Sequence, residues 1–387
     1  MTINNEHKKL NVPNLRFPEF QGEWEEYRIE DITENISSGR CKSRSSNGKY
    51  NLYGSTGIIG KTNEACYEGN LVLVARVGAN AGSLQILNEP CGITDNTLII
   101  KPKEVDVQYI YYFLQHFNLN RLIFGSGQPL ITGGMLKKVK VSLGTIQEQN
   151  KITRLLSVLD ERISTQSKII DKLQSLIKGM EDNLLNNPLW EKTYLRSFMQ
   201  FFSTNSLSWE QLSYDEGEIR NLHYGLIHGF QTRGINSASL PMIKNEAVPK
   251  QYTLCQVGDV AFADASEDTG EIAKSVEFVD TIEGDTICGL HTIHGRDIKN
   301  RTVVGFKGFA FNSRYFHNQI KRLAQGTKVF SITANNLSSC YVYLPDLETQ
   351  KAIVELLKAY EAQLIVSRKT LKQYEKQKQY LLRQMFI

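Results

Sequence analysis

Two long stretches of the chain carry apolar residues at alternating steps of four and three, which is the spacing of a coiled-coil seam. The stretches lie within 148–185 and 349–386; polar Gln166 and Ser367 interrupt the two seams at the same place, and Lys378 breaks the second again. A seam this regular predicts a long helix that packs lengthwise against another helix. The positions expected to pair the helices are Ile152, Leu156, Leu159, Ile163, Ile170, Leu173, Ile177, Met180 and Leu184 in the first stretch, and Ile353, Leu357, Tyr360, Leu364, Leu371, Tyr374, Leu381 and Met385 in the second.

The two stretches superimpose at a fixed offset of 201 (350 − 149), and the same offset continues upstream. Ile131-Thr132 matches Ile332-Thr333, and Arg121-Leu122 with Gly125-Ser126 matches Arg322-Leu323 with Gly326-Thr327. Farther upstream, related segments recur at smaller offsets, as in Cys91-Gly92-Ile93-Thr94 and Cys288-Gly289-Leu290-His291. The sequence therefore predicts a duplicated unit, a globular part followed by a long helix, with the two helices as partners.

The sequence predicts a mixed α/β fold for the two globular parts. Short β-rich runs such as Leu71-Val72-Leu73-Val74-Ala75 alternate with Gly/Asn/Ser turns, joined in the first half by one helical stretch over 107–124. The predicted fold class is thus α/β (mixed), with two globular domains separated by two long antiparallel coiled-coil helices and an internal two-fold repeat. The expected boundaries are 1–144 for the first globular domain, 145–187 for the first helix, 188–345 for the second domain and 346–387 for the second helix.

Composition narrows the class of protein. At 387 residues the chain can hold two domains with proper cores. No apolar run reaches the length of a membrane span, and the polar start MTINNEHKKLNVPN lacks a signal-peptide core, so we expect the protein in the cytoplasm. Six scattered cysteines without a C-x-x-C pair fit reduced, buried thiols rather than a disulfide or zinc framework.

Acidic residues are absent from corresponding portions of both halves, although the net charge is only +4. The acid-free windows lie between Glu34 and Glu64, Asp106 and Glu148, Glu218 and Glu246, and Asp297 and Asp346. They contain Lys and Arg beside Asn, Gln, Ser and His, which are the side chains that contact phosphates and base edges. This segregation of charge favours a nucleic-acid-binding face over a charge-segregated surface without a ligand.

Signals for catalysis and metal binding are weak. Gly54-Ser55-Thr56-Gly57-Ile58-Ile59-Gly60-Lys61-Thr62 resembles a phosphate-binding loop with the wrong spacing, and the motifs of a methyltransferase are missing. Cys288, His291 and His294 could suggest a metal, but strand alternation puts Cys288 and His291 on opposite faces and no fourth ligand is suitably spaced. We expect no catalytic residue and no metal; His291 is read as either a base contact or a buried histidine.

Several segments together resemble the specificity subunit of type I restriction-modification systems, over essentially the whole chain. They are Leu15-Arg16-Phe17-Pro18-Glu19-Phe20 with Trp24, the strand and turn Leu73–Gly82, Ile93-Thr94-Asp95-Asn96-Thr97, and the helix starts Ile146-Gln147-Glu148-Gln149 and Leu347-Glu348-Thr349-Gln350. Each motif alone has low specificity for the family. Their order, repeated in two halves that each end in a long helix, is specific. The second half departs from the pattern near 195–235, where the Phe-Pro-x-Phe opening is absent.

The resemblance implies that each globular part is a target recognition domain that reads one half of an asymmetric, bipartite site in double-stranded DNA. The two helices would be spacers that set the distance between half-sites and dock two modification (methyltransferase) subunits. Two restriction subunits, ATP-dependent translocases and nucleases, would complete the assembly. S-adenosylmethionine and ATP with Mg²⁺ would be bound by those partners, and this chain would hold no cofactor and catalyse nothing.

The candidate DNA contacts are long polar side chains in the acid-free windows and in the turns beside them. Arg76 and Asn80 are the sharper candidates, because a strand that ends in Gly78-Ala79-Asn80 projects polar groups from a turn. The full set is Arg40, Lys42, Arg44, Tyr53, Ser55, Arg76, Asn80 and Gln128 in the first domain, and His223, Tyr224, Gln231, Arg233, Ser266, His291 and Lys328 in the second.

Two other classes of protein stay open on sequence alone. A coiled-coil scaffold or interaction protein without DNA-reading function would be indifferent to loss of Arg76 and Arg233. An independent nuclease or methyltransferase would show activity from this chain by itself, which the missing motifs disfavour.

Overall fold

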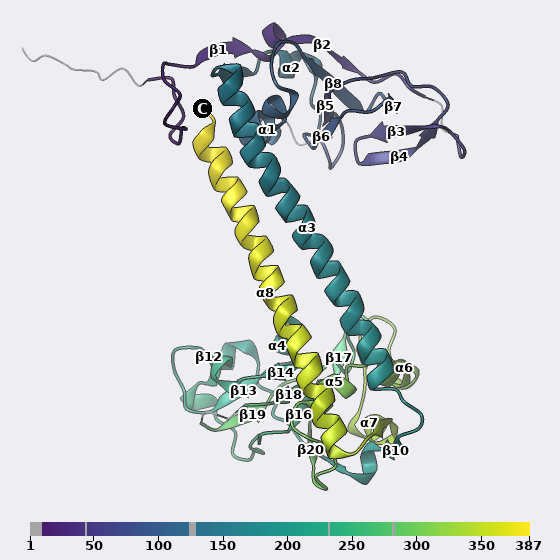
Figure 1. Cartoon of the computed structure of the whole chain (residues 1–387). Helices are drawn as coiled ribbons and strands as arrows, with labels where there is room; N and C mark the ends of the chain where they lie inside the picture. The colour runs from purple at the N-terminus through teal and green to yellow at the C-terminus, as the bar shows by residue number, and fades with distance from the viewer. Residues whose placement is uncertain (1–9, 43–44, 124–128, 231–232, 281, 283) are drawn as a thin grey trace, which may run out of the picture. The chain divides into compact units, whose positions relative to one another are not determined.

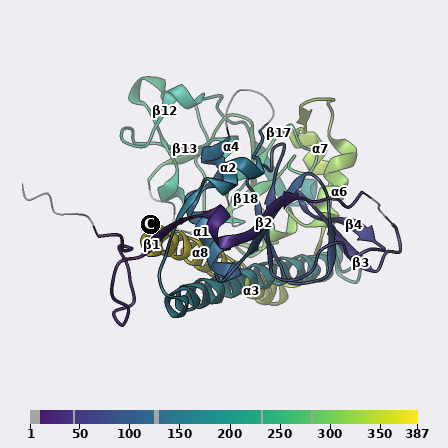
Figure 2. The ribbon, with the colours of Figure 1, turned by 90° about the horizontal axis from the view of Figure 1, so that it is seen from above.

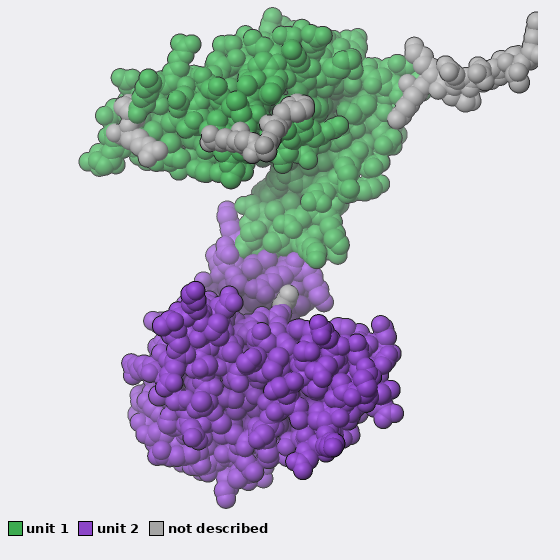
Figure 3. All heavy atoms as spheres, turned by 180° about the vertical axis from the view of Figure 1, so that it is seen from behind, with its two compact units in different colours: residues 1–167, 370–387 green, residues 168–369 purple. Residues whose placement is uncertain are grey.

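The computed structural model describes residues 10–42, 45–123, 129–230, 233–280, 282 and 284–387. The chain forms two compact units, residues 1–167 with 370–387 (unit 1) and residues 168–369 (unit 2), shown in Figure 3. Two long helices, α3 (Ile146–Leu184) and α8 (Leu347–Met385), each contribute one part to each unit (Figure 1). Because these units divide both helices, they do not test the predicted four-segment boundaries, which stay a prediction.

Unit 1 is built on a four-stranded antiparallel sheet in the order β2-β8-β5-β6. A second sheet, β4-β3-β7, lies on the side of the unit away from β1 (Figures 1 and 2) and contains a parallel pair, β3 with β7. The strands are β1 (Glu25–Arg28), β2 (Thr33–Ser38), β3 (Tyr50–Gly54), β4 (Gly57–Thr62), β5 (Leu71–Ala75), β6 (Leu84–Leu87), β7 (Cys91–Ile93), β8 (Thr97–Pro102) and β9 (Lys140–Leu143), and the short helices are α1 (Val107–Phe117) and α2 (Gly133–Lys137).

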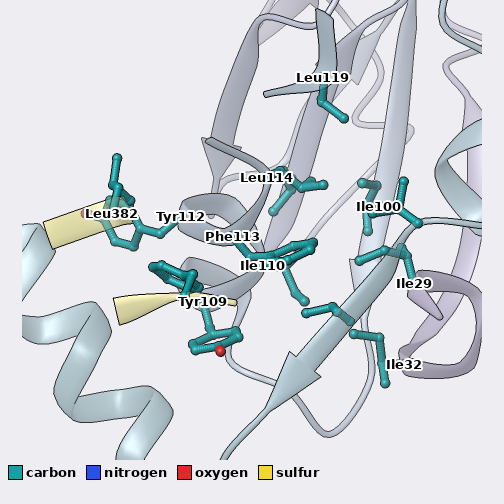
Figure 4. Packing of buried hydrophobic residues seen from close by; sticks show 14 of the residues in the cluster. Ile29, Ile32, Ile100, Tyr109, Ile110, Tyr112, Phe113, Leu114, Leu119 and Leu382 are labelled. Carbon is teal, nitrogen blue, oxygen red and sulfur yellow. The ribbon is translucent and has the colours of Figure 1, made fainter. Parts of the chain in front are cut away.

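Strand β5 is buried on both faces, which explains its unbroken apolar sequence. Val72 and Val74 point into a large core with α1 and the helix ends, whereas Leu71 and Leu73 point into a smaller core with β3 and β7. Figure 4 shows part of the larger core, where Ile29 and Ile32 pack near α1.

Unit 2 has the same layout with longer loops. Its main sheet has the order β11-β20-β16-β18-β14, and β13 pairs in parallel with β19 in a second sheet, β12-β15-β13-β19. The strands are β10 (Glu191–Tyr194), β11 (Met199–Phe202), β12 (Leu212–Ser213), β13 (Arg220–Leu222), β14 (Gly234–Ile235), β15 (Met242–Ile243), β16 (Val260–Ala263), β17 (Ala265–Ser266), β18 (Ser275–Phe278), β19 (Thr286–Cys288), β20 (Thr292–Asp297), β21 (Phe330–Ser331) and β22 (Tyr341–Leu344), and the short helices are α4 (Tyr224–Gly229), α5 (Phe306–Ala310), α6 (Arg314–Leu323) and α7 (Ala334–Ser339).

The central strand of unit 2, β16, divides its side chains between two cores as β5 does. Val260 and Phe262 enter the core that contains α5 and α6, and Ala261 and Ala263 enter the core beside α4. Each unit is also closed by an antiparallel pair that leads into a long helix: β1 with β9 before α3, and β10 with β22 before α8. The paired elements follow the same order along the two halves of the chain.

The two long helices pack on each other inside each unit. In unit 1, Leu156 and Leu159 share a core with Leu381 and Met385, so the start of α3 contacts the end of α8. In unit 2, Leu185, which directly follows α3, shares a core with Ile353, Val354 and Leu357 at the start of α8, and Met180 and Leu184 of α3 pack against this core. All seventeen predicted pairing positions are buried or half-buried. The large apolar residues of the two helices that are exposed lie off the seam; they are Ile146, Val158, Ile169, Leu176, Leu347, Leu356, Val366 and Tyr380.

The helix predicted over 107–124 is shorter in the structure than expected. The helical stretch expected over 107–124 ends as α1 at Phe117, because Asn118 adopts a left-handed backbone (φ 57°) and a short 3-10 turn, Leu119–Leu122, follows. Asparagine tolerates this conformation better than most residues and often ends helices. The periodicity of apolar residues continues through the turn, which is why the sequence alone did not locate the break.

The amino-terminal segment is anchored to the start of α3 by a buried carboxylate. Glu148, 1% exposed, accepts from Arg16 Nε at 2.7 Å and Nη2 at 2.9 Å, and from Trp24 Nε1 at 3.1 Å. In the second half Thr349 stands at the matching position and no Arg16-type arm precedes β10. The Arg16–Glu148 pair therefore has no counterpart at the matching position of the second long helix.

We expect Arg16→Ala to lower the free energy of unfolding of unit 1 by about 2–3 kcal/mol, because the buried Glu148 carboxylate keeps only the Trp24 indole as a partner. Urea unfolding followed by tryptophan fluorescence measures it. Arg28→Ala is the matched control, since the Arg28 side chain is exposed and its ion pair in the described part of the chain is with exposed Glu30. An equal, small effect of both substitutions would contradict the role of Arg16 as the anchor.

Candidate nucleic-acid interface

Three segments of unit 1 meet at the end of strand β5. The backbone N–H of Arg76 donates to the carbonyl of Asn96 at 2.9 Å, and the N–H of Ile131 donates to the carbonyl of Arg76, also at 2.9 Å. Arg76 is thus held between the turn before β8 and the segment before α2, and the turn that contains Asn80 follows it. We call these three segments, 76–82, 94–96 and 129–132, the first loop cluster.

Unit 2 repeats this hydrogen-bond frame at the end of β16. The N–H of Asp264 donates to the carbonyl of His291 at 3.0 Å, and the N–H of Ile332 donates to the carbonyl of Asp264 at 3.0 Å. The turn after the central strand is also closed by an equivalent backbone hydrogen bond in the two units. The Ala75 N–H donates to the Ser83 carbonyl in unit 1, and the Ala263 N–H donates to the Lys274 carbonyl in unit 2. Segments 264–273, 289–291 and 330–333 form the second loop cluster.

The frame is the same in the two clusters, but the side chains on it differ. Where unit 1 has Arg76 and Asn96, unit 2 has Asp264 and His291, whose Oδ1 and Nδ1 atoms are 3.0 Å apart. The Arg76 side chain is half-buried, and its Nε is buried without a hydrogen-bond partner among the described residues. Asn80 is exposed on the turn beyond it. A constant frame that carries different polar groups can present two different hydrogen-bonding patterns to a ligand.

The predicted contact residues fall into three groups by exposure, and Arg44, Gln128 and Gln231 lie outside the described residues. Exposed side chains are free to meet a large ligand, whereas buried ones would require movement. The exposed residues are Arg40, Lys42, Asn80, His291 and Lys328; the half-buried ones are Ser55, Arg76, Tyr224, Arg233 and Ser266; and the buried ones are Tyr53 and His223.

The loop clusters bring together only part of the predicted set. Arg76 and Asn80 belong to the first cluster, and Ser266 and His291 to the second, where the Tyr224 ring contacts the His291 ring edge-on at 5.3 Å. Arg40, Lys42, Tyr53 and Ser55 instead lie in or beside the β4-β3-β7 sheet, and Lys328 lies on the segment that leads into β21.

Two predicted residues are committed to internal contacts. The Tyr53 hydroxyl donates to Glu89 at 2.7 Å, and burial, reinforced by this carboxylate, raises the pKa of Tyr53 to about 12. His223 caps α4 by accepting from the Gly225 N–H at 3.1 Å and packs on the Trp209 ring; burial lowers its pKa, with His291 nearby adding to the shift. Both remain predicted contacts, but in this conformation each supports a neighbouring loop.

Unit 2 contains a cavity of about 930 Å³, and eight of its 22 lining residues are basic. Three acidic side chains, Glu181, Glu271 and Glu361, also line it. Segments of α3, α6 and α8 form the wall together with the loops that follow α4 and precede β18. A concave basic wall of this size suits the phosphates of a polyanion. The basic residues are Lys178, His228, Arg233, Lys274, Arg314, His317, Lys321 and Arg368.

Sequence reasoning chose Arg233 from this wall and missed the others. Two of the missed wall residues, Arg314 and Lys321, stand in the acid-free window 297–346, so the sequence could have identified them as candidate contacts. The same holds for Asn96 of the first loop cluster, which stands in the segment 93–97 that carried the resemblance. Lys178 and Arg368 gave none, because each lies on a long helix among mixed charges.

Arg233 joins the second domain to both long helices. Its guanidinium lies 3.3 Å from Glu181 on α3 and 3.4 Å from Glu361 on α8, and both carboxylates are buried. Burial raises the pKa of Glu361 to about 7, and burial also raises the pKa of Glu181, while Arg233 acts in the opposite direction on both. As a DNA contact, Arg233 would have to leave these two acids; in the present geometry it positions the domain.

The raised pKa of Glu361 predicts a pH-dependent stability. The folded state holds the proton more tightly than the unfolded chain, so this contribution is fully present below about pH 4.5 and is lost as pH rises towards 7. We expect the urea midpoint of unit 2 to fall between pH 5 and pH 7.5, and Glu361→Gln to flatten that slope. A wild-type and variant profile of the same slope would contradict the assignment.

Comparison with known proteins agrees with this architecture. The family model described as the type I restriction modification DNA specificity domain matches residues 21–175 and 289–376. The type I restriction enzyme MjaVIII specificity subunit of Methanocaldococcus jannaschii is 26% identical over an alignment of 417 positions, which covers 99% of this chain and 96% of that protein.

Two solved structures share the fold. The S subunit of a type I restriction-modification system from M. genitalium superimposes with a TM-score of 0.64 at 16% identity, covering 97% of this chain and 99% of that one. A chain from a study of complex assembly and conformational transition of the type I R-M system gives a TM-score of 0.56 at 12% identity, covering 93% and 96%.

These matches cover the segments that frame both loop clusters and both long helices. The chain belongs to the family of type I restriction modification DNA specificity domains. Within it, the chain is a specificity subunit of a type I restriction-modification system, as the resemblance in the sequence indicated. Among the described residues, no helix combines the length and apolar character needed to cross a membrane.

Proposed function

We propose that each loop cluster reads one half of an asymmetric, bipartite site in double-stranded DNA. The observation that carries this proposal is the repeated hydrogen-bond frame around Arg76 and Asp264, which bears different side chains in the two units. In unit 1 an arginine and an asparagine suit guanine and adenine edges, respectively. In unit 2 the carboxylate of Asp264 and the ring of His291 suit another pattern of donors and acceptors. Basic side chains nearby, such as those of the unit 2 cavity, would contact phosphates and set the register.

The two long helices act in this proposal as an antiparallel coiled-coil spacer between two copies of one duplicated unit. The equivalent starts of α3 and α8 support the duplication: Gln149 donates to the Gly144 carbonyl and Gln350 to the Pro345 carbonyl, both at 3.0 Å. Thr145 and Asp346 cap the two helices at matching positions. A fixed spacer length would define the gap between half-sites.

The subunit supplies recognition, not catalysis. Two modification subunits, which bring S-adenosylmethionine and methylate adenine, would dock along the helices and adjoining surfaces. Two restriction subunits that use ATP and Mg²⁺ would join that assembly and cleave unmodified DNA. This division of labour rests on the family relationship, and it assigns none of these cofactors to the present chain.

Exchange of residues 191–345 for those of a homologue tests the proposal. Single-molecule sequencing of adenine methylation should then show one half-site changed and the other kept, with the same gap. Change of both half-sites would contradict separate reading by the two domains. An unchanged methylome after deletion of the gene, in a host with an active modification subunit, would favour a scaffold without DNA-reading function.

A further inference from the structure

Two cysteines and a histidine of unit 2 lie together in the protein interior. Cys255 precedes β16, Cys288 ends β19 and His294 lies in β20. One ligand atom from each falls within 4.8 Å of the other two, and all three side chains are buried. In the described part of the chain, this is the one group of cysteine, histidine and acidic residues that meets such a criterion.

The distance between the sulfur atoms suits a bridging metal. The Sγ atoms of Cys255 and Cys288 are 3.6 Å apart, far beyond a disulfide bond of about 2.05 Å. Two thiolates on a tetrahedral ion with metal–sulfur bonds of about 2.3 Å would be about 3.8 Å apart. The cysteines are therefore already close to the separation that a tetrahedral dithiolate site requires.

The histidine is held by a second layer of polar contacts. Its Nε2 lies 2.7 Å from Oδ2 of Asp259, which is 1% exposed. Arg296 donates to both oxygens of the same carboxylate, at 2.8 and 2.7 Å. A carboxylate that orients a histidine through one ring nitrogen leaves the other nitrogen directed for a metal, and this pairing recurs in metalloproteins.

We infer that Cys255, Cys288 and His294 form a site for a divalent metal ion of the thiolate-preferring class, with Zn²⁺ as the best fit. Two sulfurs and one imidazole match the donors that Zn²⁺ takes in tetrahedral sites, and three protein ligands leave the fourth position to water. Ligation releases one proton from each thiol as two positive charges enter, so the net charge of the buried cluster does not change. No oxidant or reductant is needed.

Among the described residues of unit 1 there is no equivalent site, so we expect one metal ion per chain. Cys91 corresponds to Cys288 in the aligned Cys-Gly segments, but strand β8 reads Thr97-Leu98-Ile99-Ile100 where β20 reads Thr292-Ile293-His294-Gly295. The imidazole ligand is therefore absent from the matching strand.

The location suggests a purpose for the ion. Cys288 is followed directly by Gly289-Leu290-His291, the segment of the second loop cluster whose His291 carbonyl accepts from Asp264. Fixing Cys288 to β20 and to the segment before β16 would brace this loop from inside. The role in bracing rests on the proposed DNA-reading function, whereas metal binding itself does not.

Metal analysis of the full-length chain tests the site. After loading with Zn²⁺ and desalting, we expect about one zinc per wild-type chain, and Co²⁺ in its place should give an intense thiolate-to-metal charge-transfer band in the near ultraviolet. Cys288→Ser should lower the metal content at least fivefold. Cys340→Ser, which removes a buried cysteine of the same unit outside the cluster, should leave it unchanged.

Three results would overturn the inference. They are less than about 0.2 metal ions per wild-type chain without a Co²⁺–thiolate band, equal metal content in wild type and Cys288→Ser, or a Cys255–Cys288 disulfide in protein purified anaerobically. The Co²⁺ spectrum uses wild-type protein, so it tests thiolate ligation even if the cysteine variants fold poorly. Metal without any effect on the methylation motif would leave the site standing and contradict only its role in bracing the loop.

Discussion

Replacing Arg76 by alanine is expected to lower adenine methylation of the native target by about 10- to 100-fold, which corresponds to 1–3 kcal/mol of lost discrimination and contact energy. The reason is geometric: both backbone polar groups of Arg76 are engaged by neighbouring segments, while its buried Nε has no partner among the described residues. The fold thus fixes the backbone of Arg76, and its half-buried side chain lies in the first loop cluster with exposed Asn80. Methylation assays on oligonucleotide duplexes, with the modification subunits present, measure the effect.

The pattern of loss identifies what Arg76 contacts. A base contact should relax the sequence requirement at one position of one half-site, whereas a phosphate contact should weaken all sequences equally and reduce the salt dependence by about one unit in the log–log slope. Arg28→Ala is the matched control, because it removes an exposed arginine of the same unit from strand β1. If both variants methylate the native site as wild type does, Arg76 is not part of the interface.

Replacing Lys307 by methionine is expected to lower the free energy of unfolding of unit 2 by about 3–5 kcal/mol. Lys307 and Glu277 are 2% and 0% exposed, and their Nζ and Oε1 atoms lie 2.9 Å apart. The Lys307 Nζ and the Glu277 Oε1 form an ion pair whose angles do not meet those of a hydrogen bond. The other oxygen of Glu277 accepts a hydrogen bond from the Gly308 N–H at 2.8 Å. Methionine keeps the shape of the lysine stem but leaves a charged carboxylate in the core.

Urea unfolding followed by circular dichroism measures this loss. The double variant Lys307→Met with Glu277→Leu should recover part of the stability, because it removes the unpaired buried charge. It should stay below wild type, because the Gly308 N–H loses its acceptor. A single variant within about 0.5 kcal/mol of wild type would show that the carboxylate takes up a proton or finds another partner, and would contradict the prediction.

Local pattern was enough to predict the long helices. Their seam residues, from Ile152 to Met385, repeat at a period that only a helix can present on one face, and the observed α3 and α8 bury or half-bury every one of them. The polar turn after β5 was likewise predictable, since an apolar run followed by Gly78-Ala79-Asn80 marks a strand end. The break of the predicted helix at Asn118 was not, because a tolerated left-handed residue does not interrupt the apolar periodicity.

Contacts between distant segments were beyond the sequence. Arg233 stands in an acid-free window and therefore reads as a phosphate contact, yet it pairs with Glu181 and Glu361, 52 and 128 positions away on two different helices. The acid-free window shows only that no acidic residue is near in sequence, whereas Coulomb interactions depend on which charges are near in space. Tyr53 and His223 were chosen for the same reason and are buried by strands and rings that the local sequence does not specify.

The cysteines show the same limit. The spacing of Cys288, His291 and His294 could suggest a metal, but from the sequence we expected none. In the structure His291 is exposed in the loop cluster, and the groups that gather are Cys255, Cys288 and His294. Cys255 lies 33 residues before Cys288 and joins it only because the segment before β16 runs beside β19, where the Cys255 N–H donates to the Thr286 carbonyl at 2.8 Å.

By itself, the sequence determined the two long helices and the family, because the periodicity and the order of the motifs are carried by residues that lie close together along the chain. Only the tertiary structure decided which polar groups face outwards at the ends of β5 and β16, which are consumed by internal pairs, and which thiols meet a histidine. Those outcomes depend on strand order and register, which bring together residues whose separation along the chain carries no signal.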